Sequence, residues 1–375
     1  MKIVIAGFGW VLGLCCLELM VLSFMAGHYL SSLCALIMMI ILVPLFRKWF
    51  WEYTGFKIPV WLQIILVPVC FFLFVTLILI TLGNKYSIYE NTEIEKKITN
   101  IYNNHLAQWN PENQTSYITT QYGKVHVIAS GKPEYPPLLL LHASSMASWS
   151  WLYNVDGLNK FYRTYAIDTI GDAGRSSLAD MDVYPQNGEQ LAALYEEIMD
   201  SLKVEKASVI GASQGGYIAT NLALYAPDRV DKLILCGPLG YTSTLRSVLR
   251  IIFTTMFPLK PIQENATHWA FGNNPKVLAE VSDWFYTVLD GVISQQARPK
   301  AFTDEQLKSL KMPVLLLLGT HDGLVGNPKH ARKRVANLPD FQTSELNTGH
   351  LISVEKPKQF NRMVLQFLMD GCRKE

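Results

Sequence analysis

Charged side chains are scarce in this sequence. Only 17% of its 375 residues are Asp, Glu, Lys or Arg, against about a quarter in an ordinary soluble domain. The shortage falls almost entirely before residue 83, and charged residues are regular after it. The formal net charge is +2. A nearly neutral chain lacks the basic balance of nucleic-acid-binding domains, so we expect no nucleic-acid partner.

The cysteines have no spacing that suggests a disulfide framework or a zinc site. Four of the six lie in apolar runs, and the other two are far apart in the chain. They are Cys15, Cys16, Cys34 and Cys70, then Cys236 and Cys372. We therefore expect no bound metal and no cofactor.

Three apolar runs fill the beginning of the chain, at Ile3–Met25, Leu30–Phe46 and Val60–Leu82. A helix needs about 20 apolar residues to cross a bilayer. A cleaved signal peptide would have one shorter run followed by a polar mature chain, which does not fit. We predict three transmembrane helices within residues 1–83, and the lipid bilayer is an expected partner. Glu18, inside the first run, is left without an assigned role.

Basic residues predict the orientation of these spans. Lys2 precedes the first run, and Arg47, Lys48 and Lys57 lie between the second and third. The positive-inside rule puts both places in the cytoplasm. Three spans then place everything after Leu82 outside. We predict a multi-pass protein, expected in the plasma membrane, with an extracytoplasmic C-terminal domain.

A polar linker at residues 84–116 follows the last apolar run. Ile94, Ile98, Ile101 and Leu106 recur in it at roughly helical spacing. This pattern predicts an amphipathic helix that lies on the next domain.

From residue 117 to 375, strand-like and helix-like segments alternate. Tyr117–Ile128 reads as a hairpin turning near Gly123. The expected buried strands are Pro137–His142, Tyr162–Asp168, Ala207–Ala212, Lys232–Cys236, Pro313–Gly319 and Phe341–Leu346. The expected helices are Gly188–Leu202, a segment just after Ser213, and Pro357–Met369. Apolar strands that alternate with helices predict an α/β domain with a mostly parallel sheet. The helical stretch at about residues 239–308 breaks the pattern and predicts a cap over the strand ends.

A candidate nucleophile, Ser213, lies between a predicted strand and a predicted helix. The surrounding residues are Gly211-Ala212-Ser213-Gln214-Gly215. A sharp strand-to-helix turn of this kind, a nucleophile elbow, lifts the serine hydroxyl above the sheet. Glycines on either side prevent collisions with neighbouring backbone.

A serine hydroxyl needs a base and an acid that orients the base. His350 follows the strand that ends near Leu346, so we predict it to be the base. Asp322 leaves the preceding strand and is the predicted acid. The less favoured histidines are His142, His321 and His105, and the rival acids are Asp340 and Glu355.

The oxyanion formed during acyl transfer needs two N–H donors. One is expected from Gln214, directly after the nucleophile. The second is expected from the loop after the strand that ends at His142, where Ser144 is the first choice and Ser145 the alternative. The same serines also fit an ordinary helix cap.

Together these segments resemble the α/β-hydrolase superfamily from about Thr115 onward. The stretch Asp168–Ser176 is similar to the family loop D-x-x-G-x-G-x-S, with Asp172 in place of the second glycine. A second departure is His142-Ala143, where the family has His-Gly. Within the superfamily, Tyr162–Asp172 and Phe302–Asp322 look most like bacterial carboxylesterases that hydrolyse naproxen esters.

The resemblance implies a serine hydrolase that cleaves a small carboxylic ester through an acyl-enzyme. Two alternatives stay open. The same triad could hydrolyse an amide, a lactone or a C–C bond, or the protein could be a slowly hydrolysing membrane sensor of a ligand. The replacement of Asp by Ser213 disfavours haloalkane dehalogenase chemistry.

Overall fold

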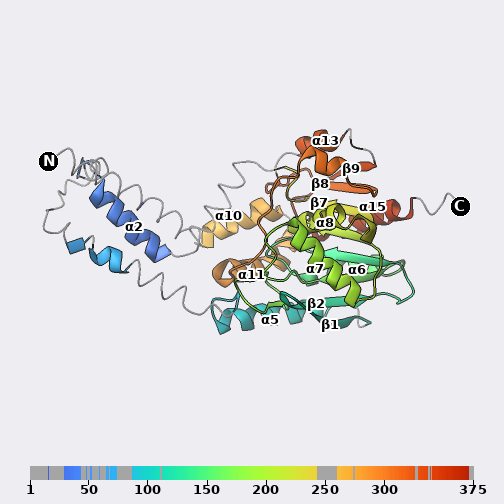
Figure 1. Ribbon diagram of the computed structural model, residues 1–375, viewed down its shortest axis with the longest axis horizontal. Coiled ribbons are helices and arrows are strands. Elements are labelled where there is room, and N and C mark those ends of the chain that lie inside the picture. The colour runs from blue at the N-terminus through green and yellow to red at the C-terminus, as the bar shows by residue number, and fades with distance from the viewer. Residues whose placement is uncertain are drawn as a thin grey trace. The chain divides into compact units, whose positions relative to one another are not determined.

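The structure is a computed structural model, and Figure 1 shows its arrangement of elements. It describes residues 16, 29–43, 48, 51–52, 59, 65–66, 68–73, 87–109, 112–242, 260–272, 275–325, 328–336, 338 and 340–370. The chain divides into two compact units. The N-terminal unit comprises Met1–Lys85 with Ile252–Phe257, and the sheet unit comprises Tyr86–Ile251 with Pro258–Glu375.

The N-terminal unit contains helix α2, Tyr29–Leu42, which is apolar along most of its length. Among the helices that the described residues form, none combines the length and the apolar character that a bilayer crossing requires. Glu18 and most of the three predicted spans lie outside the described residues.

The sheet unit is built on nine strands within its described residues, in the order β1-β2-β4-β3-β6-β7-β8-β9, with β5 beside β2. The strands are β1 Gln114–Thr120, β2 Gly123–Ser130, β3 Pro137–Leu141, β4 Arg163–Ile167, β5 Ser177–Leu178, β6 Ala207–Ala212, β7 Val230–Cys236, β8 Val314–Gly319 and β9 Phe341–Leu346. The β1–β2 hairpin is antiparallel, and β2 pairs antiparallel with β4. From β4 to β9 every pair is parallel. The predicted mostly parallel sheet is therefore confirmed.

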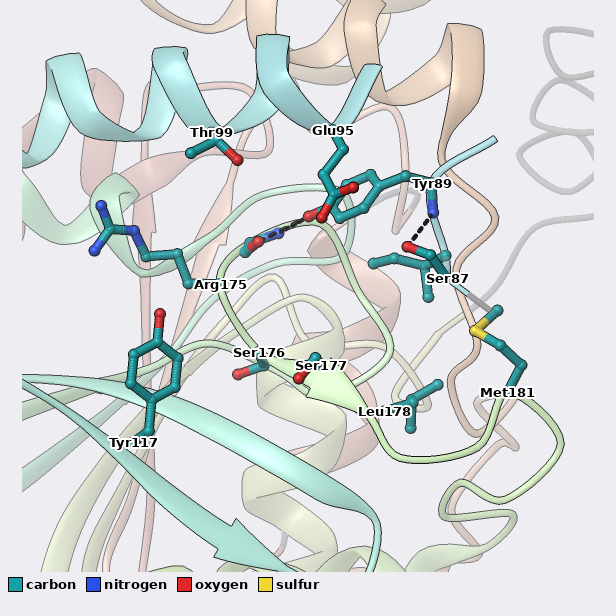
Figure 2. A pocket seen from close by; sticks show the side chains of 12 residues that line it. Ser87, Tyr89, Glu95, Thr99, Tyr117, Arg175, Ser176, Ser177, Leu178 and Met181 are labelled. Atoms are coloured by element: carbon teal, nitrogen blue, oxygen red, sulfur yellow. Dashed lines mark hydrogen bonds between the residues drawn. The ribbon is translucent and has the colours of Figure 1, made fainter. Parts of the chain in front are cut away.

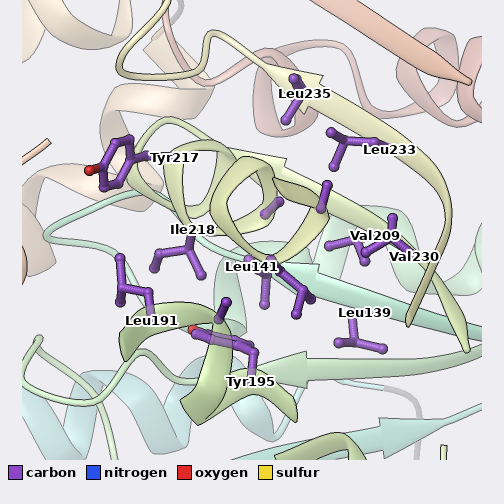
Figure 3. Packing of buried hydrophobic residues seen from close by; sticks show 14 of the residues in the cluster. Leu139, Leu141, Leu191, Tyr195, Val209, Tyr217, Ile218, Val230, Leu233 and Leu235 are labelled. Carbon is purple, nitrogen blue, oxygen red and sulfur yellow. The ribbon is translucent and has the colours of Figure 1, made fainter. Parts of the chain in front are cut away.

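Strand β3 shows why these segments are apolar throughout. Successive side chains of a strand point to opposite faces, so Leu139 and Leu141 pack in one core and Leu138 and Leu140 in another. All four are fully buried. Figure 3 shows the first core, where Leu139 and Leu141 gather with Tyr195 of α7 and Ile218 of α8.

Helices cover both faces of the sheet. Helices α7, Gly188–Ser201, and α8, Gln214–Tyr225, pack in the first core. The second core takes α5, α6, α11 and α15. Their bounds are α5 Thr92–Leu106, α6 Leu152–Leu158, α11 Pro275–Gly291 and α15 Pro357–Met369. Helix α10 spans Lys260–Phe271. The remaining described helices of this unit are short: η1 Ser148–Trp151, η2 Pro227–Arg229, α12 Asp304–Lys308, α13 Pro328–Val335 and α14 Ile352–Glu355.

Helix α5 is the amphipathic helix predicted in the linker. Asn91 caps its start by accepting hydrogen bonds from the N–H groups of Glu93 and Ile94. Its buried side chains Ile98, Tyr102 and His105 recur at three- and four-residue spacing. They pack within the sheet unit, and α5 contacts α11.

Whether residues 239–308 form a separate cap layer, as predicted, stays a prediction. Of this stretch, residues 243–259 and 273–274 lie outside the described residues. The described part contains α10, α11, the start of α12 and an extended segment from Val292 onward.

Candidate active site

Ser213 stands at the turn between β6 and α8 with a strained backbone. Its φ of 52° and ψ of −112° lie in a region that costs a non-glycine residue about 1–3 kcal/mol. Hydrogen bonds hold it there: its N–H donates to Cys236 O at 2.9 Å, and its carbonyl accepts from Leu239 N–H at 3.1 Å. Ser213 is buried, with 6% of its surface exposed. The backbone therefore makes the sharp strand-to-helix turn at Ser213 that the sequence predicted.

Gly215 explains the second glycine of the motif. A Cβ on this residue would overlap the carbonyl oxygen of Leu141 and come within 2.7 Å of His142 O. The Gly215 N–H also donates to His142 O at 3.1 Å. The first turn of α8 is thus packed against the loop that leaves β3, as the oxyanion prediction requires.

His350 and Asp322 meet at the neighbouring strand ends. His350 Nδ1 lies 2.7 Å from Asp322 Oδ2, and both side chains are buried. The other carboxylate oxygen, Oδ1, accepts N–H groups from Leu324 at 2.8 Å and Val325 at 3.1 Å. Because an ionised carboxylate only accepts, Nδ1 carries the ring proton and Nε2 is left as the basic nitrogen. Nε2 is buried and has no hydrogen-bond partner among the described residues.

The segment after β7 joins Ser213 to this pair. Cys236 and Leu239 bond the Ser213 backbone, and Gly237 lies between them. A Cβ on Gly237 would sit 3.0 Å from Asp322 Oδ2 and 3.2 Å from His350 Nδ1. The structure therefore brings the three sequence-predicted residues to one edge of the sheet.

The rival histidines have other contacts. His142 Nδ1 lies 2.8 Å from Ala143 O, and Nε2 accepts from Thr169 N–H at 2.9 Å, so both of its nitrogens are used within the fold. His105 stacks on Trp149, and burial lowers its pKa. His321 is exposed beside Thr320.

The rival acids do not reach the ring of His350 in the same way. Asp340 directly precedes β9, at the opposite end of that strand from the loop that carries His350. Glu355 ends α14 and lies against Gly349, where burial raises its pKa. Asp322 already occupies the Nδ1 position.

The oxyanion loop after β3 is a tight turn. Met146 N–H donates to Ala143 O at 3.1 Å, which makes Ser144 and Ser145 its two central residues. Ser145 has a φ of 62°, the left-handed value that the third position of a type II turn requires. Its N–H donates to Asp172 Oδ2 at 2.9 Å. Ser145, the alternative donor, is thereby occupied, and Ser144 stays the predicted one beside Gln214, which begins α8.

The adjoining loop is organised around Asp168, which is fully buried. Its carboxylate accepts N–H groups from Ser148 at 2.8 Å and Arg175 at 3.0 Å, and the hydroxyl of Tyr102 at 3.0 Å. His126 Nδ1 lies 3.0 Å away. Burial alone would raise the pKa of Asp168, but the hydrogen bond and charge of His126 outweigh it and lower the pKa to about 2. This cluster stabilises the loop.

Asp172, predicted to stand where the family has its second glycine, has hydrogen-bond partners of its own in this loop. Gly174, with a φ of 156°, is the glycine that lies against the Asp168 carboxylate, 3.1 Å from its Cγ if it carried a Cβ. Asp172 is instead a fully buried acceptor for Ser145 and Ala173 N–H and for the Ser294 hydroxyl. Burial raises its pKa, although these donors oppose the shift.

An extended segment, Ser294–Ala297, borders both oxyanion elements, and sequence reasoning did not find it. Gln214 Nε2 donates to Ala297 O at 3.1 Å, and Gln296 Nε2 lies 3.3 Å from Ser144 Oγ. Gln295 N–H donates to Gly171 O at 2.7 Å. The departure at Asp172 was the available signal, but nothing in the sequence paired it with Ser294.

A separate cavity of about 310 Å³ lies between α5, β1 and the loop after Gly174. Tyr89, Glu95, Tyr117 and Arg175 are among its lining residues, as Figure 2 shows. None of the three triad candidates lines it. Within the described residues, no group of three or more His, Cys, Asp or Glu side chains could hold a metal ion.

Known proteins resemble this chain over about seven tenths of its length, 72% and 71% in two relatives. The family model of the alpha/beta hydrolase fold matches residues 136–261. Carboxylesterase YbfK of Bacillus subtilis (strain 168) is 30% identical over 291 residues, 72% of this chain and 93% of the relative. The uncharacterized carboxylesterase nap of the same strain is 32% identical over 294 residues, 71% of this chain and 90% of the relative.

A solved structure agrees with these relatives. The crystal structure of naproxen esterase (carboxylesterase NP) from Bacillus subtilis superposes with a TM-score of 0.67 at 29% identity. The match covers 74% of this chain and 99% of that one. The expected similarity to such carboxylesterases is confirmed, and this chain belongs to the α/β-hydrolase family as a carboxylesterase-like member.

Proposed function

We propose that this protein is a membrane-tethered serine hydrolase that cleaves small carboxylic esters through an acyl-enzyme. The observation that carries the proposal is the buried Asp322–His350 hydrogen bond of 2.7 Å at the sheet edge where Ser213 stands. The choice of an ester as the substrate rests on the similarity to the carboxylesterase relatives. The triad geometry alone would serve other acyl-transfer substrates equally well.

The proposed reaction begins with proton transfer. His350 Nε2 takes the Ser213 proton as Oγ attacks the ester carbonyl, and Asp322 stabilises the imidazolium that results. The N–H groups of Gln214 and Ser144 receive the oxyanion. His350 then protonates the departing alcohol. Water, activated by the same nitrogen, attacks the acyl group on Ser213, and the acid leaves with Ser213 reprotonated.

The test compares the wild type with Ser213→Ala. A fluorophosphonate probe should label the wild type alone, and p-nitrophenyl esters of several chain lengths should be hydrolysed by the wild type alone. Absence of labelling on the folded wild type would overturn the proposal. Labelling without ester turnover would favour a slowly hydrolysing sensor, and turnover by Ser213→Ala would identify another nucleophile.

Membrane tethering rests on the N-terminal apolar runs and on exposed apolar side chains among the described residues of that unit. Phe72 is 70% exposed, and Ile65 and Phe71 are each 54% exposed. Large exposed apolar side chains such as these are expected on a segment that contacts lipid. We therefore propose that residues 1–83 are the bilayer anchor, in the orientation that the basic residues favour. Full-length protein should remain in the membrane pellet after a carbonate wash.

The proposed orientation places the hydrolase unit outside the cell. Cys372 supplies a natural probe because it lies in the polar C-terminal tail, whereas Cys236 is buried. A membrane-impermeant maleimide should label intact cells that carry the wild type, and Cys372→Ser should abolish that labelling. Labelling that requires permeabilised cells would reverse the proposed orientation.

A further inference from the structure

Ser145 is held from two sides by side chains outside the triad. Its N–H donates to Asp172 Oδ2 at 2.9 Å, and its carbonyl accepts the Trp284 indole N–H at 2.8 Å. Asp172 comes from the loop after β4, and Trp284 from α11. Both side chains are fully buried. A serine at a φ of 62° therefore has each of its backbone polar groups bonded to a buried side chain.

These bonds fix the orientation of the preceding residue. The N–H of Ser145 belongs to the same peptide plane as the carbonyl of Ser144, so Asp172 fixes that plane. Ser144 is the first central residue of the turn closed by Ala143 and Met146, and the turn bond does not use its N–H. The Ser144 N–H itself lies in the neighbouring peptide plane, with the Ala143 carbonyl that accepts the Met146 N–H of the turn. By holding Ser145 at a φ of 62°, Asp172 and Trp284 keep this turn closed, and the closed turn keeps the Ser144 N–H in one direction. An oxyanion donor helps only while it is aimed in advance.

We propose that Asp172 is a positioning residue, which keeps the Ser144 N–H directed at the oxyanion, with Trp284 as the matching clamp on the carbonyl side. The inference rests on the proposed function. It also explains the buried carboxylate: an alanine at 172 would leave the Ser145 and Ala173 N–H groups and the Ser294 hydroxyl without their acceptor.

The Ser294 hydroxyl, 3.0 Å from Asp172 Oδ1, provides a matched control. Ser294→Ala removes one donor from this carboxylate but leaves the bond to Ser145 intact. Asp172→Asn is a partial replacement. Its Oδ1 accepts the Ser145 N–H when the amide nitrogen faces Ser294, whose hydroxyl can rotate to accept, but the Ala173 N–H then loses its acceptor.

The experiment measures kcat and KM of the full-length enzyme on a p-nitrophenyl ester, per active site counted with a fluorophosphonate. In Asp172→Ala, kcat should fall at least about tenfold, toward the roughly 10²–10³-fold loss of an oxyanion donor, with KM within about twofold. Ser294→Ala should stay within about threefold of the wild type, and the kcat of Asp172→Asn should lie between those of the wild type and Asp172→Ala. The Ki of a trifluoromethyl ketone, which mimics the oxyanion, should rise in proportion to the fall in kcat/KM.

A merely structural role would change the number of active sites without changing kcat per site or the inhibitor Ki. That result in Asp172→Ala would overturn the inference while leaving the proposed function intact, whereas an unlabelled, inactive wild type would overturn the proposed function itself. If Asp172→Ala does not fold, Trp284→Phe tests the inference instead, because it removes the indole N–H that donates to the Ser145 carbonyl. It should show the same fall in kcat and rise in Ki, and wild-type values for it would overturn the inference.

Discussion

At the scale of single residues, the position of one proton on His350 controls the proposed chemistry. Asp322 Oδ1 is held by the N–H groups of Leu324 and Val325, so only Oδ2 faces the ring. In Asp322→Asn the same two N–H groups keep the amide oxygen, and the NH₂ group faces Nδ1. The ring proton then moves to Nε2, which no longer accepts a proton from Ser213.

We expect Asp322→Asn to lower kcat by roughly 10⁴-fold while the protein stays folded. The measurement is ester hydrolysis at saturating substrate, together with thermal unfolding. Asp340→Asn is the control, because Asp340 precedes β9 at the other end of the strand. A fall in kcat in Asp340→Asn, with none in Asp322→Asn, would show that the acid is misassigned.

Asp168 should make the stability of the sheet unit depend on pH. Its pKa is about 2 in the folded protein, against about 3.9 in an unfolded chain. A depressed pKa stabilises the fold fully above about pH 5, and this contribution, on the order of 2–3 kcal/mol, is lost progressively as pH falls toward 2. Urea unfolding at pH 6 and pH 3 should therefore show a smaller difference between wild type and Asp168→Asn at the lower pH. Parallel pH dependences would contradict the assignment.

At the scale of elements, α5 stabilises the sheet unit although it lies in the linker. Ile98 is fully buried, so Ile98→Ala should cost about 2–5 kcal/mol, a Tm decrease of roughly 5–15 °C. Heat-induced loss of fluorophosphonate labelling in the full chain is the measurement. Ile101→Ala, at a partly exposed position of the same helix, should lower the Tm less. Equal decreases would mean that burial does not determine the effect.

Long apolar strands were predictable from the sequence, but short elements were not. Strands β3, β6 and β8 are buried along their length, and their apolar runs predicted them to within about two residues. Strand β5 has two residues and α14 has four, too few for any periodicity to appear. Both depend on contacts with elements far away in the sequence: β5 pairs with β2, and α14 packs on α6.

The candidate site likewise contains residues that the sequence predicted and contacts that it did not. Ser213, Asp322 and His350 each follow a predicted strand, so the common edge of parallel strands brings them together. The bonds that Asp172 makes join segments 27 and 122 residues apart. No local pattern encodes such pairs, which is why the sequence indicated a departure at Asp172 but not its partner.

At the scale of the whole molecule, the hydrolase chemistry lies within the sheet unit and the proposed anchor lies before it. A chain that begins at Asn84 should be released from membranes by a carbonate wash, because the apolar runs are gone. Its kcat on p-nitrophenyl acetate per labelled site should remain within about threefold of the full-length value, because the hydrogen bonds described for Ser213, Asp322 and His350 are made within the sheet unit. A truncated chain that still resists the wash would refute the proposed anchor.

In the proposed reaction, Ser213 carries the acyl group during turnover. The most direct test of this step is rapid acid quenching of the enzyme with a p-nitrophenyl ester, followed by mass analysis of the peptides. We expect the acyl mass on the peptide that contains Ser213, with more of it retained in a variant whose deacylation is slowed. An acyl group found on another residue, or a burst of p-nitrophenol with no acylated peptide, would contradict it.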